Sequence, residues 1–402
     1  MMLVFGCGLG WVVSERQKNA RGQAVIDAIR EFDGYVEFDT SKPAQPAWIR
    51  LLLGDDSFRV LARVDFTNSE ITDTGLEHLR GLTQLRSLSL MDTEITDTGL
   101  EHLKGLLQLE QLLLHDTRIS DAGLEHLKEL TRLQKLWLNN TKITDVGLEY
   151  LKGMTQLQDL RLDDSEISDA GMEHLKGLTQ LEQLLLNNTK ISDAGLEHLK
   201  GMTQLRLLYL DETKITDAGL EHIKGLTQLF SLSLRNTKII GEGLEHLKRL
   251  SRLEFLNLSE TEITGFGLEH LKGLTMLKEL NLGYTKITDV GLKHIKGLTQ
   301  LQTLSLSKTE ITDVGMENLK GLVQLHRLWL NNTKIADAGL EHIKGLTQLE
   351  QLLLDNTKIT DAGLEHLKGL TLLKLLNLGN TKITDAGLAD VKKALPNCVV
   401  FK

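Results

Sequence analysis

The chain has 402 residues, of which 35 are glycine, 3 are proline and only 4% are aromatic, a bias that is typical of a repeat array and argues against a mosaic of globular domains. The formal net charge is -9, and no basic face stands out that could neutralise a phosphate backbone, so nucleic acid is excluded as an expected partner. Cys7 and Cys398 lie at opposite ends of the chain, which leaves neither zinc-ligand spacing nor a disulfide framework.

The first segment, residues 1–14, is apolar. Its uninterrupted apolar stretch covers residues 2–13, fewer than the roughly 20 residues that span a bilayer as a helix. Basic residues follow this stretch instead of preceding it, unlike an ordinary signal peptide. We expect the end of a membrane anchor that begins upstream, so that the protein associates with a membrane through its N-terminus. The alternative is a disordered or buried cap on a cytoplasmic protein.

Residues 15–60 differ from the rest of the chain and predict an N-terminal cap. The pattern indicates a helix over residues 15–31, a strand from Tyr35 to Phe38 and a second apolar helix from Trp48 to Leu53. Such a cap is needed because the first turn of a stacked array would otherwise expose its apolar layer to water.

Residues 61–394 contain an internal repeat with a period of 24 residues and no insertion. The repeat is seen most easily in the glycine of its TDxG segment, which recurs from Gly75 to Gly387 in fourteen copies. Each copy has the form LxxLxLxxTxITDxGLxxLxxL. A fixed period of this length predicts a solenoid in which each copy is one structural turn.

The apolar spacing within one copy predicts a strand followed by a helix. Leu88 and Leu90 alternate with a polar residue and so share one face of a short strand. From Gly99 onward the leucines recur every third residue through Leu106, which builds one stripe on a helix, and Asp97 or Thr96 is placed to cap its first amides. Parallel strands should therefore stack on one side of the coil and the helices on the other.

This pattern resembles the leucine-rich repeat family over residues 61 to 402. The resemblance implies an α/β solenoid, a horseshoe with parallel strands on its concave face and short helices on its convex face. The ITDxGL segment is similar to the cysteine-containing subtype, but Thr93 and its equivalents stand where that subtype carries cysteine. The chain also resembles bacterial proteins with near-identical 24-residue repeats behind a short apolar N-terminus. Residues 395–402 break the repeat at Pro396 and predict a C-terminal cap ending in a strand.

Eleven histidines occupy one column of the repeat, from His78 to His366, in most copies between a glutamate and a leucine. Because copying one repeat produces such a column automatically, we interpret it as the flank of a solvated helix face and expect no metal site and no cofactor. Catalysis needs a nucleophile, a base and an oxyanion donor that converge from different segments. A solenoid holds its columns parallel, so we expect no catalytic residues and no enzymatic activity.

The copies differ most at the outward strand position between the two leucines. From the third to the seventh copy this position predicts an apolar and aromatic strip on the concave face, with acidic residues beside it that favour a partner with a basic rim. The predicted partner-binding residues are Leu113, Trp137, Arg161, Asp163, Leu185, Tyr209 and Asp211.

The resulting hypothesis is a monomeric, non-catalytic scaffold that binds a protein through its concave face. One alternative is a structural or cell-surface array in which repeat number matters and no single patch binds a partner. Another is carbohydrate binding by stacking on Trp137 and Trp329, although these tryptophans are eight copies apart.

Overall fold

The structure is a computed structural model that describes residues 24–39 and 61–402. The chain divides into two compact units, Met1–Leu181 and Glu182–Lys402. In the repeats of both units, a three-residue strand, a turn and a short helix follow one another, as the 24-residue pattern predicts.

The first unit contains a sheet whose strands lie side by side in chain order. Its strands are β1 (Tyr35–Phe38), β2 (Leu61–Asp65), β3 (Ser87–Ser89), β4 (Gln111–Leu113), β5 (Lys135–Trp137) and β6 (Asp159–Arg161). β1 is antiparallel to β2, and the later neighbours are parallel. Leu88 pairs with Leu112, and Leu112 pairs with Leu136, so equivalent residues of successive repeats lie next to each other.

The described part of the N-terminal region covers the first repeat. Residues 24–31 are helical and β1 has the predicted bounds, which confirms both predictions within the described residues. Ile29 and Phe66 are each 1% exposed, and both side chains lie against Gly34, where a Cβ atom would come within 2.6 Å of each. The predicted apolar segment 1–14 and the predicted helix Trp48–Leu53 lie outside the described residues. Within the described ranges, no helix has the length and apolar character that a membrane crossing requires.

The helices of the first unit are shorter than the leucine spacing predicts. They are η2 (Gly75–Leu79), α3 (Asp97–Leu100), η3 (Glu101–Leu103), α4 (Asp121–Glu125), α5 (Asp145–Leu148), η4 (Glu149–Leu151) and α6 (Asp169–Leu175), where η marks a 3₁₀ turn. Leu106 was expected on the helical stripe, but it lies beyond η3, after Gly105, and glycine disfavours a helix. Leu106 is nevertheless fully buried.

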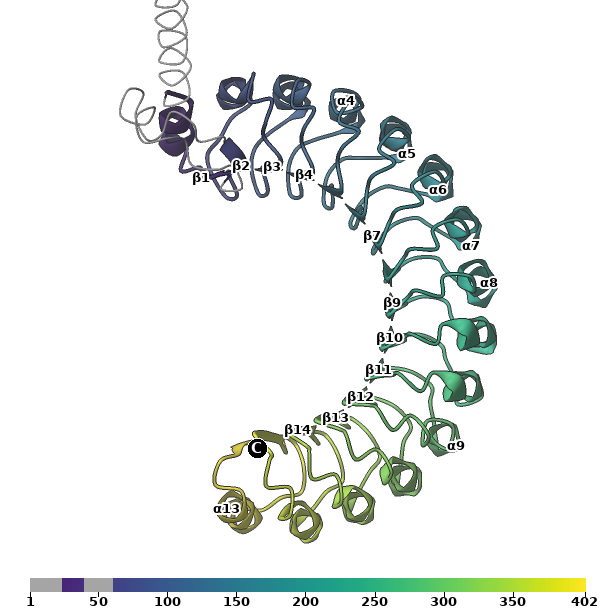
Figure 1. Cartoon of the computed structure of the whole chain (residues 1–402). Helices are drawn as coiled ribbons and strands as arrows, with labels where there is room; N and C mark the ends of the chain where they lie inside the picture. The colour runs from purple at the N-terminus through teal and green to yellow at the C-terminus, as the bar shows by residue number, and fades with distance from the viewer. Residues whose placement is uncertain (1–23, 40–60) are drawn as a thin grey trace, which may run out of the picture. The chain divides into compact units, whose positions relative to one another are not determined.

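The second unit repeats the same arrangement with parallel strands in chain order. Its strands are β7 (Gln183–Leu185), β8 (Leu207–Tyr209), β9 (Ser231–Ser233), β10 (Phe255–Asn257), β11 (Glu279–Asn281), β12 (Thr303–Ser305), β13 (Arg327–Trp329), β14 (Gln351–Leu353), β15 (Leu375–Asn377) and β16 (Val399–Phe401). Within each unit the strands line the inner side of a curved stack and the helices its outer side (Figure 1).

The helical segments of the second unit are again mostly single turns. They are α7 (Asp193–Leu196), η5 (Glu197–Leu199), η6 (Asp217–Gly219), α8 (Leu220–Ile223), η7 (Glu242–Arg249), η8 (Gly267–Gly273), α9 (Asp289–Leu292), α10 (Asp313–Met316), η9 (Glu317–Leu319), α11 (Asp337–Leu340), η10 (Glu341–Ile343), α12 (Asp361–Leu364), η11 (Glu365–Leu367) and α13 (Asp385–Ala394). α13 ends before Pro396, and β16 pairs with β15, as the C-terminal pattern predicts.

The leucine and isoleucine positions of the repeat form the core. In the repeat that begins at Leu85, the side chains of Leu88, Leu90, Ile95, Leu100 and Leu103 are fully buried. Each turn covers the apolar layer of its neighbour, so burial that one repeat cannot achieve alone becomes continuous in the stack.

The threonine that follows each strand forms a hydrogen bond within its own turn. Thr93 Oγ1 donates to the carbonyl oxygen of Leu90 at 2.6 Å, and both are buried. The same bond recurs at Thr117, Thr141, Ser165, Thr189, Thr213, Thr237, Thr261, Thr285, Thr309, Thr333, Thr357 and Thr381. A buried hydroxyl thereby gains a partner without a bond to the neighbouring repeat.

The aspartate of the TDxG segment, in contrast, joins neighbouring repeats. Asp73 accepts hydrogen bonds from the backbone N–H of Thr96 at 2.8 Å and from the Thr96 hydroxyl at 2.5 Å. The same pair of bonds joins Asp97 to Ser120, Asp121 to Thr144, Asp145 to Ser168, Asp193 to Thr216, Asp289 to Thr312, Asp337 to Thr360 and Asp361 to Thr384. The sequence predicted that Asp97 or Thr96 caps α3. The Asp97 carboxylate binds the next turn instead, and Thr96 stands at the N-cap of α3 but makes no side-chain hydrogen bond to it.

Two repeats of the second unit lack this aspartate and carry Gly241 and Gly265 in its place. A Cβ atom at Gly241 would lie 2.9 Å from the Cα atom of Gly267, and one at Gly265 would lie 2.9 Å from the Cα atom of Gly291. Gly241 also has a φ of 119°. Here the backbones of adjacent repeats approach closely, and the helical segments η7 and η8 are 3₁₀ throughout. The missing carboxylate is thus a lost bond between repeats.

Candidate functional site

Three of the predicted binding residues lie side by side at the ends of strands in the first unit. Leu113 on β4 pairs with Trp137 on β5, which pairs with Arg161 on β6. Trp137 and Arg161 are half-buried, whereas Leu113 is only 9% exposed. The accessible part of this group is therefore formed by Trp137 and Arg161.

The indole of Trp137 is held in one orientation by its neighbours. Its Nε1–H donates to Asp159 Oδ2 at 2.9 Å, and the guanidinium carbon of Arg161 lies 3.6 Å from the ring centroid. Lys135 Nζ lies 5.1 Å from the same ring, and the ring centroid of His115 is 5.8 Å away. Cations over an indole face are attracted by its quadrupole, so these contacts restrict the ring while leaving part of it accessible.

The acidic residues of the first unit are less available than the sequence suggests. Asp159 is 5% exposed and takes the indole N–H, Lys135 Nζ at 3.6 Å and Arg161 Nε at 3.5 Å. Asp163 is 8% exposed. Because Asp159 lies beneath Lys135 and Arg161, these two basic side chains are what solvent meets on that side of Trp137, whereas the exposed carboxylates of Asp92 and Asp116 lie beside His115, which packs against the same ring.

The predicted residues of the second unit form a separate group. Leu185 on β7 pairs with Tyr209 on β8, and the Tyr209 ring centroid lies 6.3 Å from that of Phe255. Burial raises the pKa of Asp211 above its usual value, although its carboxylate accepts hydrogen bonds from the Ser233 hydroxyl and the Arg235 backbone N–H. The Asp211 carboxylate thus links its own turn to the following repeat.

Sequence reasoning overlooked a second column on the same face. Lys135, Leu207 and Phe255 begin the strands β5, β8 and β10, and each is half-buried. Side chains two residues apart in a strand point to the same side, so Lys135 accompanies Trp137 and Leu207 accompanies Tyr209. This period-2 relation was visible in the sequence, but only the position between the two leucines was considered.

The helix flanks agree with the predicted charged, solvated face. Glu149 and Lys152 form an ion pair at 3.4 Å and are 63% and 51% exposed. Exposed pairs of this kind contribute little to stability. In the histidine column of the same helix flank, His102 is half-buried. Burial lowers the pKa of His294, which occupies the same position in a later repeat.

Stacked turns of strand and short helix, with one conserved set of buried leucines per turn, define a solenoid repeat protein. Family models described as leucine-rich repeat match residues 81–104, 131–191 and 275–335. These segments of the chain are therefore leucine-rich repeats. The predicted fold class is thereby confirmed.

Solved structures support the same assignment. An internalin, InlF, from Listeria monocytogenes is 27% identical and matches with a TM-score of 0.64, covering 88% of this chain and 93% of its own. A leucine-rich repeat protein from Leptospira interrogans is 22% identical, with a TM-score of 0.65 and coverages of 81% and 80%. The Arabidopsis receptor kinase HAESA ectodomain, in complex with a peptide hormone, is 18% identical, with a TM-score of 0.59 and coverages of 80% and 59%. The last two show the fold alone. A search of curated protein sequences finds no significant match.

Proposed function

We propose that this protein is a non-catalytic scaffold that binds a protein partner through the strand-lined face of its repeats, with Trp137 as the anchor in the first unit. Leucine-rich repeat solenoids characteristically bind through the extended surface that their stacked turns create. The observation that carries the proposal is the fixed, half-buried indole of Trp137 with Arg161 stacked on it.

The residue types and their rigidity both favour binding. Tryptophan, tyrosine and arginine are the residues most enriched among those that dominate interface energies. Because Asp159 and Arg161 already restrict the Trp137 ring, this ring would lose little further conformational entropy when a partner packs on it.

The basic side chains of Lys135 and Arg161 beside Trp137 favour an acidic segment of the partner on that side of the ring. Lys135 and Arg161 keep 34% and 31% of their side chains exposed, while the Asp159 carboxylate between them keeps only 8%. The sequence suggested a partner with a basic rim, but the Asp159 carboxylate beside Trp137 is buried beneath Lys135 and Arg161. HAESA, which has the same fold, is a precedent for peptide binding on such an array.

The experiment that tests this proposal uses peptides selected against the full chain from a displayed random library. We expect selected peptides to be acidic, and Trp137→Ala to weaken their affinity by about 2 kcal/mol, roughly 30-fold, as truncated aromatic hot spots do. Added salt should slow association, because steering between exposed charges is screened.

Trp329→Ala is the matched control, because Trp329 occupies the same position of β13 in the second unit. Selected peptides that lose affinity with Trp137→Ala should retain it with Trp329→Ala. If no selected peptide depends on Trp137, the proposal is wrong, and the protein is better described as a structural array without one specific patch.

A further inference from the structure

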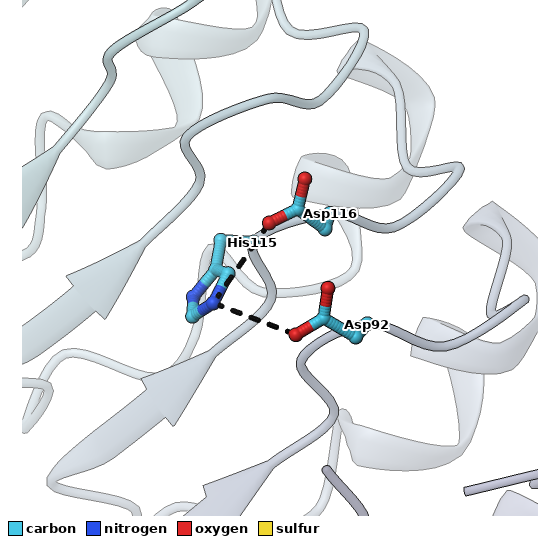
Figure 2. Close-up of side chains that lie close together, drawn as sticks. All are labelled: Asp92, His115 and Asp116. Carbon is cyan, nitrogen blue, oxygen red and sulfur yellow. Dashed lines mark ion pairs between the residues drawn. The ribbon is translucent and has the colours of Figure 1, made fainter. Parts of the chain in front are cut away.

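Two consecutive turns of the first unit bring two carboxylates to the same edge of one imidazole (Figure 2). Asp92 follows β3, and His115 and Asp116 follow β4. His115 Nε2 lies 4.0 Å from Asp92 Oδ2 and 3.9 Å from Asp116 Oδ2. All three atoms lie within 4.8 Å of one another.

The backbone places the two carboxylates in equivalent positions. Asp92 and Asp116 both have left-handed backbone conformations, with φ of 55° and 56°, which aspartate and asparagine tolerate better than most residues. Their turns are joined by the Asp92 N–H, which donates to the carbonyl oxygen of His115 at 3.1 Å. The Asn140 amide donates to Asp116 Oδ1, so that Oδ2 is the oxygen turned toward His115.

The imidazole itself presents one nitrogen to this cluster. His115 is 19% exposed, and its ring packs at a tilt of 38° against Trp137. Its Nδ1 atom is shielded from solvent and has no hydrogen-bond partner among the described residues. Nε2, which faces the two carboxylates, is therefore the ring nitrogen that a ligand from solvent can reach (Figure 2).

We propose that Asp92, His115 and Asp116 bind a divalent transition metal ion, with zinc as the ion best matched to the ligands. One imidazole nitrogen and two carboxylate oxygens suit zinc, whereas calcium and magnesium take oxygen ligands. Zinc binds these atoms at about 2.0–2.2 Å, which places tetrahedral ligands about 3.4 Å apart. The two separations from His115 Nε2, 4.0 and 3.9 Å, are larger by roughly 0.5–0.6 Å, and no pair of the three atoms exceeds this spacing by more than about 1.4 Å.

That difference is small for these side chains. Asp92 and Asp116 keep 43% and 37% of their surface exposed, so both carboxylates can move toward the ion, and water completes its coordination. The ion would join two adjacent repeats and fix His115 against Trp137. It would therefore stiffen the surface next to the proposed anchor, but its binding does not depend on the proposed function.

Titration of the full, untagged chain with zinc chloride tests the site by calorimetry and by tryptophan fluorescence. We expect one zinc ion per chain at this site and a fluorescence change that Trp137→Phe reduces. Asp92→Asn and His115→Asn should each raise the dissociation constant at least tenfold, because even partners of metal ligands are worth about 10–100-fold. Both variants should fold, since the repeat that follows Asp116 carries Asn140 at the position of Asp92 and Asn139 at the position of His115.

His102→Asn is the matched control, because it removes a histidine of the helix column and another repeat carries Asn318 there. This variant should bind zinc as the wild type does. The proposal is overturned if the wild type binds no zinc, if His115→Asn binds it with unchanged affinity, or if binding depends on His102 instead.

Discussion

The hydrogen bonds between repeats can be tested where the chain interrupts them. In the second unit, Asp337 accepts bonds from the Thr360 backbone N–H at 2.8 Å and from its hydroxyl at 2.6 Å. One repeat earlier, Asp313 accepts only the backbone N–H of Ala336, at 2.7 Å, because alanine has no hydroxyl. Ala336→Thr should therefore restore the missing bond and stabilise this part of the solenoid.

The expected gain follows from two contacts that Thr360 makes. Its hydroxyl donates to Asp337 and also accepts from the Ala362 N–H at 3.3 Å, which caps α12. A helix cap of this type contributes about 0.5–2 kcal/mol, and a hydrogen bond to a half-exposed carboxylate adds about 1 kcal/mol. Ala336 already has the extended backbone of the other cap residues, with φ of -134°. Because a single hydroxyl makes both contacts, the two contributions do not add in full, and we expect a total gain of about 1–2 kcal/mol.

Hydrogen exchange and urea unfolding provide the measurements. Exchange of the amides in α11 should slow by roughly tenfold, since 1.4 kcal/mol corresponds to a factor of ten. Ala336→Val is the control, because valine has the shape of threonine without its hydroxyl. Equal protection in the threonine and valine variants would refute the reasoning. As a further comparison, Asp337→Ala should cost more stability than Asp313→Ala, because it removes two bonds instead of one.

Three other predictions concern single positions of the second unit. Gly265→Asp restores the aspartate of the repeat pattern, but it should lower the free energy of unfolding by about 1–3 kcal/mol, because its Cβ would lie 2.9 Å from the backbone of Gly291. A higher melting temperature of this variant would contradict the expectation. Lys308→Asn should stabilise by about 0.5–1 kcal/mol in urea unfolding, because φ at this residue is 51° and asparagine tolerates the left-handed region better. The hydrogen bonds from the Thr384 hydroxyl and backbone hold the pKa of Asp361 below its ordinary value of 3.8. A carboxylate whose pKa is lowered by folding stabilises the fold at pH values above its ordinary pKa, and this stabilisation is lost as the pH falls through the folded-state pKa. The wild type should therefore lose more stability between neutral pH and pH 3 than Asp361→Asn. Equal losses would argue against this link.

The sequence determined the repeating architecture because each turn obeys local rules. Alternation of Leu88 and Leu90 around a polar residue specifies a strand and its buried face, and the 24-residue period specifies which strands become neighbours. It also located the outward position of Trp137. These properties depend on spacing along the chain, which the amino-acid order contains directly.

Only the tertiary structure decided which polar groups meet across repeats. Asp97 reaches Ser120, Asp159 is buried beneath Lys135 and Arg161, and His115 faces the carboxylate of the preceding turn. Each of these contacts joins residues of different turns, and the distance between turns depends on how the strands pair and how tightly the backbones pack. That packing sets whether a charged side chain binds a neighbour or faces solvent. It buries the Asp159 carboxylate beneath Lys135 and Arg161, which themselves stay partly exposed.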